Sequence, residues 1–199
     1  MPSILILAGP NGAGKTTISR EVLANTLGIT EFVNADVIAA GLSGFDPERV
    51  AFAAGRIMLA RLRELAESRS TFAFESTLAS RTFAPWLSGL VSHGWSVYVL
   101  YTWLHSPELA VRRVKARFAK GGHYVPPDVV ERRYFRSAAN FWHLYRPIAT
   151  RWVLRDNSTA VPIEIAIGQR LQTDRIQEPT IFRSFMECAD AGPQANEVD

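Results

Sequence analysis

The chain has 199 residues, 47% hydrophobic and 21% charged, an average composition for a globular protein with one well-buried core. Its longest apolar stretch, residues 97–104, is far shorter than the roughly 20 residues needed to span a bilayer. We therefore expect no membrane partner. The single cysteine, Cys188, excludes an internal disulfide and a thiolate zinc site, and it favours a reducing, cytoplasmic location.

The net charge of +3 is unevenly distributed along the chain. Residues 112–136 hold eight basic side chains against Asp128 and Glu131, so this segment carries +6 and the remainder −3. A solvated basic face, a nucleic-acid patch and an anion-binding lid are all compatible with such a segment. The phosphate-binding motif described below favours the lid.

Short apolar runs alternate with longer segments of helical period, which is typical of βα units around a parallel sheet. We predict an α/β fold with five parallel strands, at residues 3–8, 31–34, 71–75, 96–103 and 152–155. Helices are predicted at residues 15–27, 47–69, 82–93, 107–119 and 128–145. An additional C-terminal edge strand is expected at 160–168. We expect one domain over residues 1–188, followed by a disordered tail at 189–199.

Several helix ends have recognisable sequence signals. Asp46 and Ser106 each precede a proline and can cap the helices that follow, whereas Gly28 and Gly94 stand where helices should end. One face of the helix predicted at 128–145 is apolar and is expected to pack in the core; it carries Val130, Tyr134, Ala138, Phe141 and Tyr145.

A phosphate-binding loop, or P-loop, follows the first predicted strand and precedes the first helix. It matches G-x-x-x-x-G-K-[ST]. Its glycines let backbone N–H groups curl around a polyphosphate, while Lys15 reaches the β and γ phosphates and Thr16 offers a hydroxyl to Mg²⁺. We therefore predict that ATP binds with Mg²⁺ and serves as a phosphoryl donor. The expected cofactor-binding residues are Gly9, Pro10, Asn11, Gly12, Ala13, Gly14, Lys15, Thr16 and Thr17.

Two carboxylates follow predicted strands at the edge of the sheet where ligands gather. Asp36 comes after the second strand, and it is either the N-cap of a short helix or a general base that accepts the proton of an acceptor hydroxyl. Glu75 ends the third strand, where it can hold Mg²⁺ through water, bind substrate together with Thr77, or serve only a structural hydrogen bond.

The basic segment places several arginines on a predicted helical arm, at about 107–146. Arg113, Arg117 and Lys120 share one helix face, and Gly121-Gly122 then supplies a flexible joint. Arg132, Arg133 and Arg136 return on the following helix. An arginine placed at the γ-phosphate offsets the charge on its oxygens. Our candidates are Arg117 first and Arg133 second.

Metal and nucleic-acid sites receive little support from the remaining residues. The four histidines lack metal-ligand spacing, and only His123 lies near the arm. Aromatic residues are sparse in the basic segment, with only Phe118 and Tyr124 between residues 112 and 133, so stacking on single-stranded nucleic acid is not expected.

Five motifs in order resemble the zeta-toxin-like P-loop kinases, over about residues 1–160. They are the P-loop with Thr17, then Asn34-Ala35-Asp36, Phe74-Glu75-Ser76-Thr77-Leu78, Gly121-Gly122-His123 and Asp156-Asn157-Ser158. The resemblance implies a five-stranded parallel sheet with the P-loop kinase strand order, ATP with Mg²⁺, and UDP-N-acetylglucosamine as acceptor, under control of an antitoxin protein.

Residue by residue, the resemblance assigns roles to the same positions. Lys15 and Thr16 match the phosphate and metal residues, and Asp36 matches the base. Glu75 and Thr77 match the substrate-contacting end of the strand, and Arg117 and Arg133 match the arginines at the γ-phosphate. This chain is shorter than the best-known toxins, which leaves little room for their sugar-binding additions.

Three functional hypotheses follow from these observations. The first is a small-molecule kinase of zeta-toxin type. The second is a P-loop kinase for a nucleotide, a nucleic-acid end or another metabolite, because the same sheet serves many acceptors. The third is a non-kinase ATP-binding or nucleic-acid-binding module, whose binding would depend steeply on salt.

Overall fold

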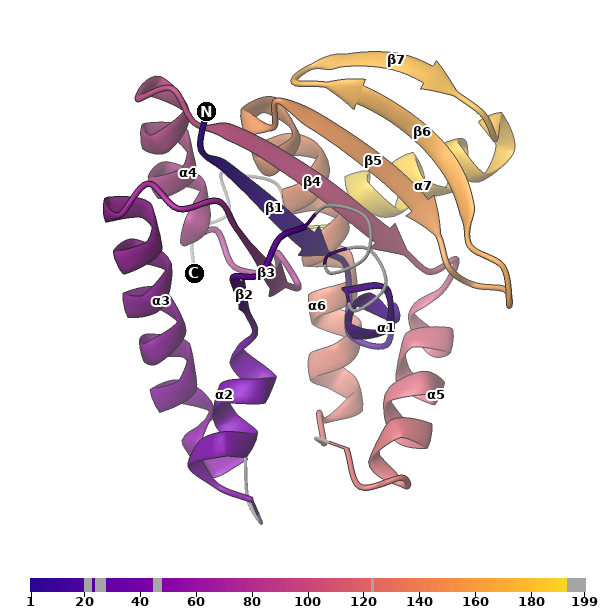
Figure 1. Ribbon diagram of the computed structural model, residues 1–199. Helices are drawn as coiled ribbons and strands as arrows, with labels where there is room; N and C mark the ends of the chain where they lie inside the picture. The colour runs from indigo at the N-terminus through magenta and orange to yellow at the C-terminus, as the bar shows by residue number, and fades with distance from the viewer. Residues whose placement is uncertain (20–22, 24–27, 45–47, 123, 193–199) are drawn as a thin grey trace.

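The computed structural model describes residues 1–19, 23, 28–44, 48–122 and 124–192. At its centre lies a seven-stranded sheet in the order β2-β3-β1-β4-β5-β6-β7 (Figure 1). Five strands are mutually parallel, namely β1 (Ser3–Ala8), β2 (Phe32–Val33), β3 (Phe72–Ser76), β4 (Ser96–Trp103) and β5 (Arg151–Asp156). The antiparallel strands β6 (Ile163–Gln169) and β7 (Gln172–Ile176) extend the sheet beyond β5. The predicted parallel core and the additional edge strand are confirmed.

Helices alternate with the parallel strands, as the βα pattern predicts. The α-helices are α1 (Lys15–Ser19), α2 (Ala35–Leu42), α3 (Ala51–Glu67), α4 (Phe83–Ser92), α5 (Pro107–Phe118), α6 (Pro127–Asn140) and α7 (Pro179–Asp190). A 3₁₀ turn, η2 (Glu48–Val50), precedes α3, and a π turn, η3 (Phe141–Tyr145), and a 3₁₀ turn, η4 (Arg146–Ile148), follow α6. Most of the second half of the helix predicted at 15–27 lies outside the described residues. Asp46, the predicted cap of the next helix, also lies outside them.

Two predicted helix ends are confirmed by hydrogen bonds and dihedral angles. The Ser106 side chain accepts a hydrogen bond from the Leu109 N–H, and α5 begins at Pro107. Gly94 follows α4 with a φ of 83°, a conformation that favours glycine.

The main hydrophobic core lies on one face of the sheet. Alternate strand residues such as Ile4, Ile6 and Phe74 are fully buried there beneath side chains of α3, α4, α6 and α7. A smaller cluster on the other face contains Leu5 and Leu7. The apolar face predicted for the last long helix is confirmed, since each of its residues is at most 2% exposed; they are Val130, Tyr134, Ala138, Phe141 and Tyr145.

The C-terminal region differs most from the sequence-based expectation. Strand β7 was not predicted because it is polar and mostly exposed. Helix α7 was not predicted either, yet its Phe185 packs against the rings of Tyr101, Trp103, Phe141 and Trp142. Residues 189 and 190, assigned to the disordered tail, belong to this helix, and residues 193–199 lie outside the described part.

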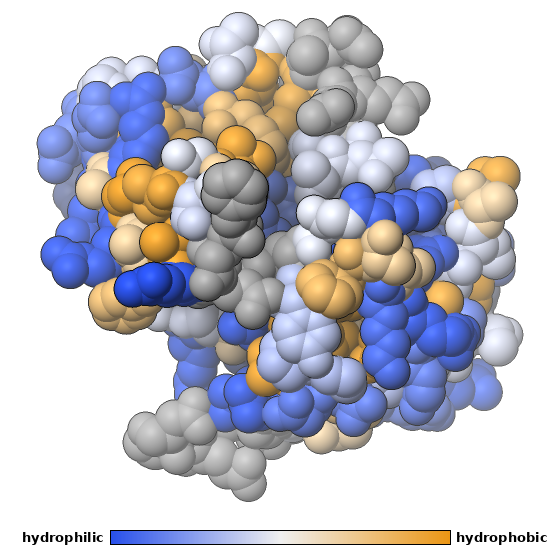
Figure 2. Space-filling model, turned by 90° about the horizontal axis from the view of Figure 1, so that it is seen from below, coloured by the Kyte–Doolittle hydropathy of each residue, from blue (hydrophilic) through white to orange (hydrophobic). Residues whose placement is uncertain are grey.

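Two pairs of helices extend beyond the carboxyl ends of the central strands. Helix α2 packs on α3 on one side, and α5 packs on α6 on the other (Figure 1). Figure 2 views the molecule from this end and shows mostly hydrophilic side chains interrupted by smaller apolar patches. In the described part of the chain, no helix combines the length and apolar character required to cross a membrane.

Candidate active site

The P-loop conformation depends on three glycines with positive φ angles. Gly9, Gly12 and Gly14 have φ values of 139°, 80° and 84°. A Cβ atom on Gly9 would lie 2.1 Å from the Thr102 carbonyl oxygen, and one on Gly14 would lie 2.6 Å from Nδ2 of Asn157. Both the dihedral angles and the close contacts therefore require glycine. The expected loop is thus packed directly against the end of β4 and the residues after β5.

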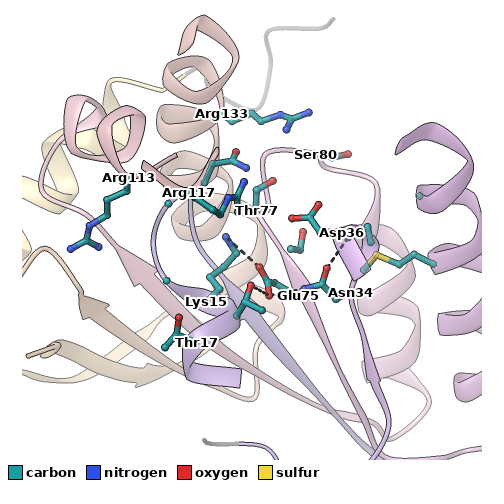
Figure 3. A pocket seen from close by; sticks show the side chains of 18 of the residues that line it. Lys15, Thr17, Asn34, Asp36, Glu75, Thr77, Ser80, Arg113, Arg117 and Arg133 are labelled. Carbon is teal, nitrogen blue, oxygen red and sulfur yellow. Dashed lines mark hydrogen bonds and ion pairs between the residues drawn. The ribbon is translucent and has the colours of Figure 1, made fainter. Parts of the chain in front are cut away.

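Three polar side chains meet around the Glu75 carboxylate at the floor of the site (Figure 3). Oε2 accepts hydrogen bonds from the Thr16 hydroxyl at 2.9 Å and from Nδ2 of Asn34 at 2.8 Å. Oε1 lies 3.8 Å from the Lys15 Nζ, which also donates to the Pro10 carbonyl at 3.0 Å. The side chains of Lys15 and Glu75 are only 7% and 11% exposed, so the ion pair is largely shielded from water.

Burial lowers the pKa of the Lys15 ammonium below its usual value. The Glu75 and Asp36 carboxylates oppose this shift, and the nearby Arg117 guanidinium adds to it. Lys15 and Arg117 thus hold two positive charges close together, an arrangement that favours an anion between them.

Asp36 stands on the opposite side of the cavity from Lys15 (Figure 3). Oδ1 of Asn34 accepts hydrogen bonds from the N–H groups of Asp36 at 2.8 Å and Val37 at 3.3 Å. Asn34 is therefore the N-cap of α2, and the interpretation of Asp36 as the N-cap is wrong. Asp36 lies in the first helical turn instead, where its exposed carboxylate faces the cavity.

A cavity of about 530 Å³ joins the P-loop to the α2–α3 pair. The sequence-predicted residues that it brings together come from the P-loop, α2, β3 and the arginine arm: Asn11, Gly12, Gly14, Lys15, Thr16, Thr17, Asp36, Glu75, Thr77, Arg117 and Arg133. Gly9, Pro10 and Ala13 belong to the loop but do not line the cavity, and Ala13 is fully buried. Further lining residues were not predicted, notably Gly55, Met58, Ser80 and Phe83.

The loop after β3 is held in place by side chains from α6 and η3. Ser137 donates to the Thr77 carbonyl, Asn140 to that of Leu78 at 2.8 Å, and Tyr145 to that of Ser80 at 2.6 Å. Leu78 is fully buried with a φ of 55°, a strained conformation for a leucine. The surrounding hydrogen bonds fix this strained loop, which carries Thr77 and Ser80 to the cavity.

The arginine arm reaches the cavity from α5 and α6. Arg113 also donates to the Ser158 carbonyl at 3.1 Å, which ties α5 to the loop after β5. Gly121, with a φ of 83°, and Gly122, whose N–H donates to the Arg117 carbonyl, form the C-terminal cap of α5. The structure thus gives the glycine pair a capping role, and its flexibility stays a prediction; His123 lies outside the described residues.

The Asp156-Asn157-Ser158 segment fixes the P-loop from behind. Nδ2 of Asn157 donates to the Ala13 carbonyl at 2.8 Å, and the Ser158 hydroxyl accepts from the His105 N–H. Buried Asp156 accepts hydrogen bonds from both the N–H and the hydroxyl of Ser158. Sequence comparison singled out this segment, but only the structure shows its contacts.

Within the described part of the chain, no cluster of three His, Cys, Asp or Glu side chains is arranged for a metal ion. A metal here would need ligands from elsewhere. Thr16 Oγ1 and Glu75 Oε2 lie 2.9 Å apart. Because Mg²⁺ is bound by few protein oxygens and keeps waters and substrate phosphates as ligands, a hydroxyl with a carboxylate beside it fits Mg²⁺ brought by a nucleotide.

A family model described as "AAA domain" matches residues 4–141, more than half of the chain. An uncharacterized protein of Haemophilus influenzae is 26% identical over 130 residues, which are 65% of this chain and 91% of that protein.

Two solved structures share the fold. One chain of the AvrRxo1-ORF1:-ORF2 crystal structure with ATP aligns with a TM-score of 0.69 and 16% identity, covering 100% of this chain and 66% of that one. The present chain therefore spans slightly less than two thirds of that relative. One chain of the PezAT chromosomal toxin–antitoxin system of Streptococcus pneumoniae aligns with a TM-score of 0.59 and 15% identity, covering 96% of this chain and 87% of that one. At these identities the likeness shows the fold alone, which is that of the P-loop kinases.

Proposed function

The chain belongs to the AAA-domain family, and from that premise we propose that it is an ATP-dependent kinase that transfers the γ-phosphoryl group to a hydroxyl of a small molecule. One observation carries the proposal. The same cavity holds the P-loop cation Lys15 with Arg117 beside it and, facing them, the carboxylate of Asp36 (Figure 3). A phosphate-binding protein without group transfer does not require a carboxylate opposite the phosphate site.

The proposed roles follow from these positions. The P-loop amides and Lys15 bind the β and γ phosphates, and Arg117 offsets the charge on the transferred group. Asp36 accepts the proton of the acceptor hydroxyl as the oxygen attacks phosphorus. Thr77, on the fixed loop after β3, contacts the acceptor.

Mg²⁺ belongs to this proposal as the ion that accompanies ATP. Thr16 would hold it directly and Glu75 through water, and the ion would neutralise charge on the phosphates. In the present structure the Thr16 hydroxyl donates to Glu75, so binding of the ion requires that the hydroxyl turn its lone pairs toward the metal.

The identity of the acceptor and the biological setting are proposed from likeness to other proteins. The resemblance to zeta-toxin-like kinases favours UDP-N-acetylglucosamine, and both structural relatives are described as members of two-component assemblies, one of them a toxin–antitoxin system. These likenesses support a search for an antitoxin-like protein partner. A nucleotide, a nucleic-acid end or another metabolite is the alternative acceptor.

The test is an incubation of the protein with ATP, Mg²⁺ and a panel of hydroxyl compounds that includes UDP-N-acetylglucosamine, followed by mass spectrometry. We expect an ATP-dependent mass gain of one phosphoryl group on at least one compound. Asp36→Asn should lower this transfer by roughly 10² to 10⁴ while ATP still binds. Full activity in Asp36→Asn would refute the assignment of the base, and absence of any product would refute the kinase assignment for that panel.

A further inference from the structure

We propose that Arg133 binds an anionic group of the acceptor, so that the acceptor is a small hydroxylated compound carrying a carboxylate or a phosphate. This inference rests on the proposed kinase function and names its substrate class. It reassigns Arg133, which the sequence placed second among the candidates for the γ-phosphate.

The two cavity-lining arginines of the arm that were candidates for the γ-phosphate face different ends of the site. Arg117, on α5, lies close to Lys15, and its positive charge helps to lower the pKa of the Lys15 ammonium. Arg133, on α6, extends toward the side of Ser80 and Asp36 (Figure 3). The Asp36 carboxylate opposes the lowering of the pKa of both Lys15 and Arg133, so the two ends are distinguished by the direction of the Arg133 side chain in the cavity. Arg117 is therefore the arginine at the phosphate end, and Arg133 the arginine at the acceptor end.

Packing of α6 fixes this position of Arg133. Ser137 lies one helical turn further along the same face and donates a hydrogen bond to the Thr77 carbonyl. Asn140, three residues beyond, donates to the Leu78 carbonyl. The face of α6 that carries Arg133 is thus anchored to the loop after β3, and the guanidinium stands over that loop at the far end of the cavity from Lys15.

The guanidinium at this end has capacity for a ligand. In the described part of the chain, Arg133 forms no ion pair with a carboxylate. Burial, with the neighbouring Arg132, lowers the pKa of Arg133 below its usual value, and Asp36 opposes the shift. The Arg133 side chain is nevertheless exposed where it lines the cavity, so its guanidinium is accessible to an anion and can bind it through charge-assisted hydrogen bonds.

The remaining walls of this end suit a small organic acceptor. Met58 and Phe83 supply apolar contacts, and Gly55 of α3 leaves open space, since no atom lies within 4 Å of the place where its Cβ would stand. The hydroxyls of Thr77 and Ser80 line the same end. A compound with a hydroxyl at Asp36 and an anionic group at Arg133 would match the two charges that face this space.

The experiment measures binding of paired compounds that differ in charge, in the presence of Mg²⁺ and a nonhydrolysable ATP analogue. The pairs are gluconate with glucitol, glucose 6-phosphate with glucose, and UDP-N-acetylglucosamine with N-acetylglucosamine. They distinguish a carboxylate, a simple phosphate and a nucleotide diphosphate as the source of the anion. Titration calorimetry gives the dissociation constants for the wild type, Arg133→Gln, Arg133→Lys and the control Arg132→Gln, whose exposed side chain does not line the cavity.

In the wild type, at least one anionic compound should bind more tightly than its neutral partner. Arg133→Gln should weaken that compound by roughly 10- to 100-fold, the range for loss of a charge-assisted hydrogen bond. Arg133→Lys should retain part of the preference, and Arg132→Gln and the affinity for the ATP analogue should not change.

Three results would overturn the inference. The first is that no anionic compound binds more tightly than its neutral partner. The second is that Arg133→Gln weakens the binding of the anionic and the neutral compound of a pair equally. The third is that Arg133→Gln weakens binding of the ATP analogue, which would place Arg133 at the γ-phosphate. Failure of the kinase proposal has a separate signature. Charge-dependent binding would then persist, while ATP phosphorylates none of the bound compounds.

Discussion

The P-loop end of the cavity, the proposed phosphate end, is held by close contacts of its backbone, whereas the proposed acceptor end is lined by side chains from several separate elements. Gly9 and Gly14 leave no space for a Cβ atom, since the loop presses against Thr102 and Asn157. At the other end, Gly55 faces open space. The phosphate end can therefore change little without loss of the fold, while the acceptor end can change its specificity one side chain at a time.

Removal of the Lys15 charge should have the largest effect on catalysis at the phosphate end. We expect Lys15→Ala to lower phosphoryl transfer by at least roughly 10² to 10³, the loss typical of one charge-stabilising group. The loss of one partner of a largely buried ion pair should lower the free energy of unfolding, but the fold should persist because Glu75 still accepts hydrogen bonds from Thr16 and Asn34. Single-turnover kinetics and circular dichroism measure the two quantities, and wild-type turnover in this variant would contradict the assignment.

A methyl group at Gly14 should disturb both binding and stability. The φ of 84° and the contact with Asn157 make Gly14→Ala unfavourable by about 1–2 kcal/mol, with a weaker affinity for ATP. Gly89→Ala is the matched control, since Gly89 lies inside α4 with open space around it. Denaturant unfolding should show a loss only in Gly14→Ala. Equal unfolding free energies of the two variants would argue against a rigid phosphate end.

A large side chain at Gly55 should block the acceptor end while sparing the phosphate end. Gly55→Leu is expected to weaken acceptor binding more than tenfold and to leave the affinity for ATP unchanged. Gly55→Ala should stabilise α3 by about 0.5–1 kcal/mol, because glycine is unfavourable within a helix. Separate titrations with ATP and acceptor test this, and loss of ATP binding in Gly55→Leu would remove the distinction between the two ends.

The smallest effect is expected from the hydroxyl of Tyr145, which holds the loop after β3 through the Ser80 carbonyl. Tyr145→Phe should lower the free energy of unfolding by about 1 kcal/mol and transfer by less than tenfold. Tyr124→Phe serves as control, because Tyr124 is 38% exposed. An unchanged stability in Tyr145→Phe would show that Ser137 and Asn140 suffice to hold the loop.

The sequence predicted the phosphate end well because its determinants are local. The P-loop glycines, the Ser106 cap and the apolar runs of β1 and β4 each depend on residues close in the chain, and the bounds of both strands agree with the prediction. Asp36 was correctly expected at the cavity, but its position in the first turn of α2 was not predicted, because Asn34 caps the helix instead.

The acceptor end was predicted poorly because its determinants are distant in the chain. Whether Gly55 and Met58 face a cavity depends on how α3 packs, which its helical period does not specify. Ser137 and Asn140 also carry no local signal, since their partners are carbonyl groups about 60 residues away. Helix α7 was missed although it has local signals, since it begins at Pro179 and its buried residues Phe185, Cys188 and Ala189 recur at helical spacing.

The Glu75 carboxylate contacts the two side chains, the Lys15 ammonium and the Thr16 hydroxyl, that a bound nucleotide with its metal ion would also use. It lies 3.8 Å from the Lys15 Nζ and accepts a hydrogen bond from the Thr16 hydroxyl, so a phosphate or metal ion that binds these groups must take them over from the carboxylate. The opposite charges of Lys15 and Glu75 offset each other in this largely buried position. The same exchange works in reverse when the product leaves, since Glu75 can reclaim both side chains and thereby oppose trapping of the spent nucleotide.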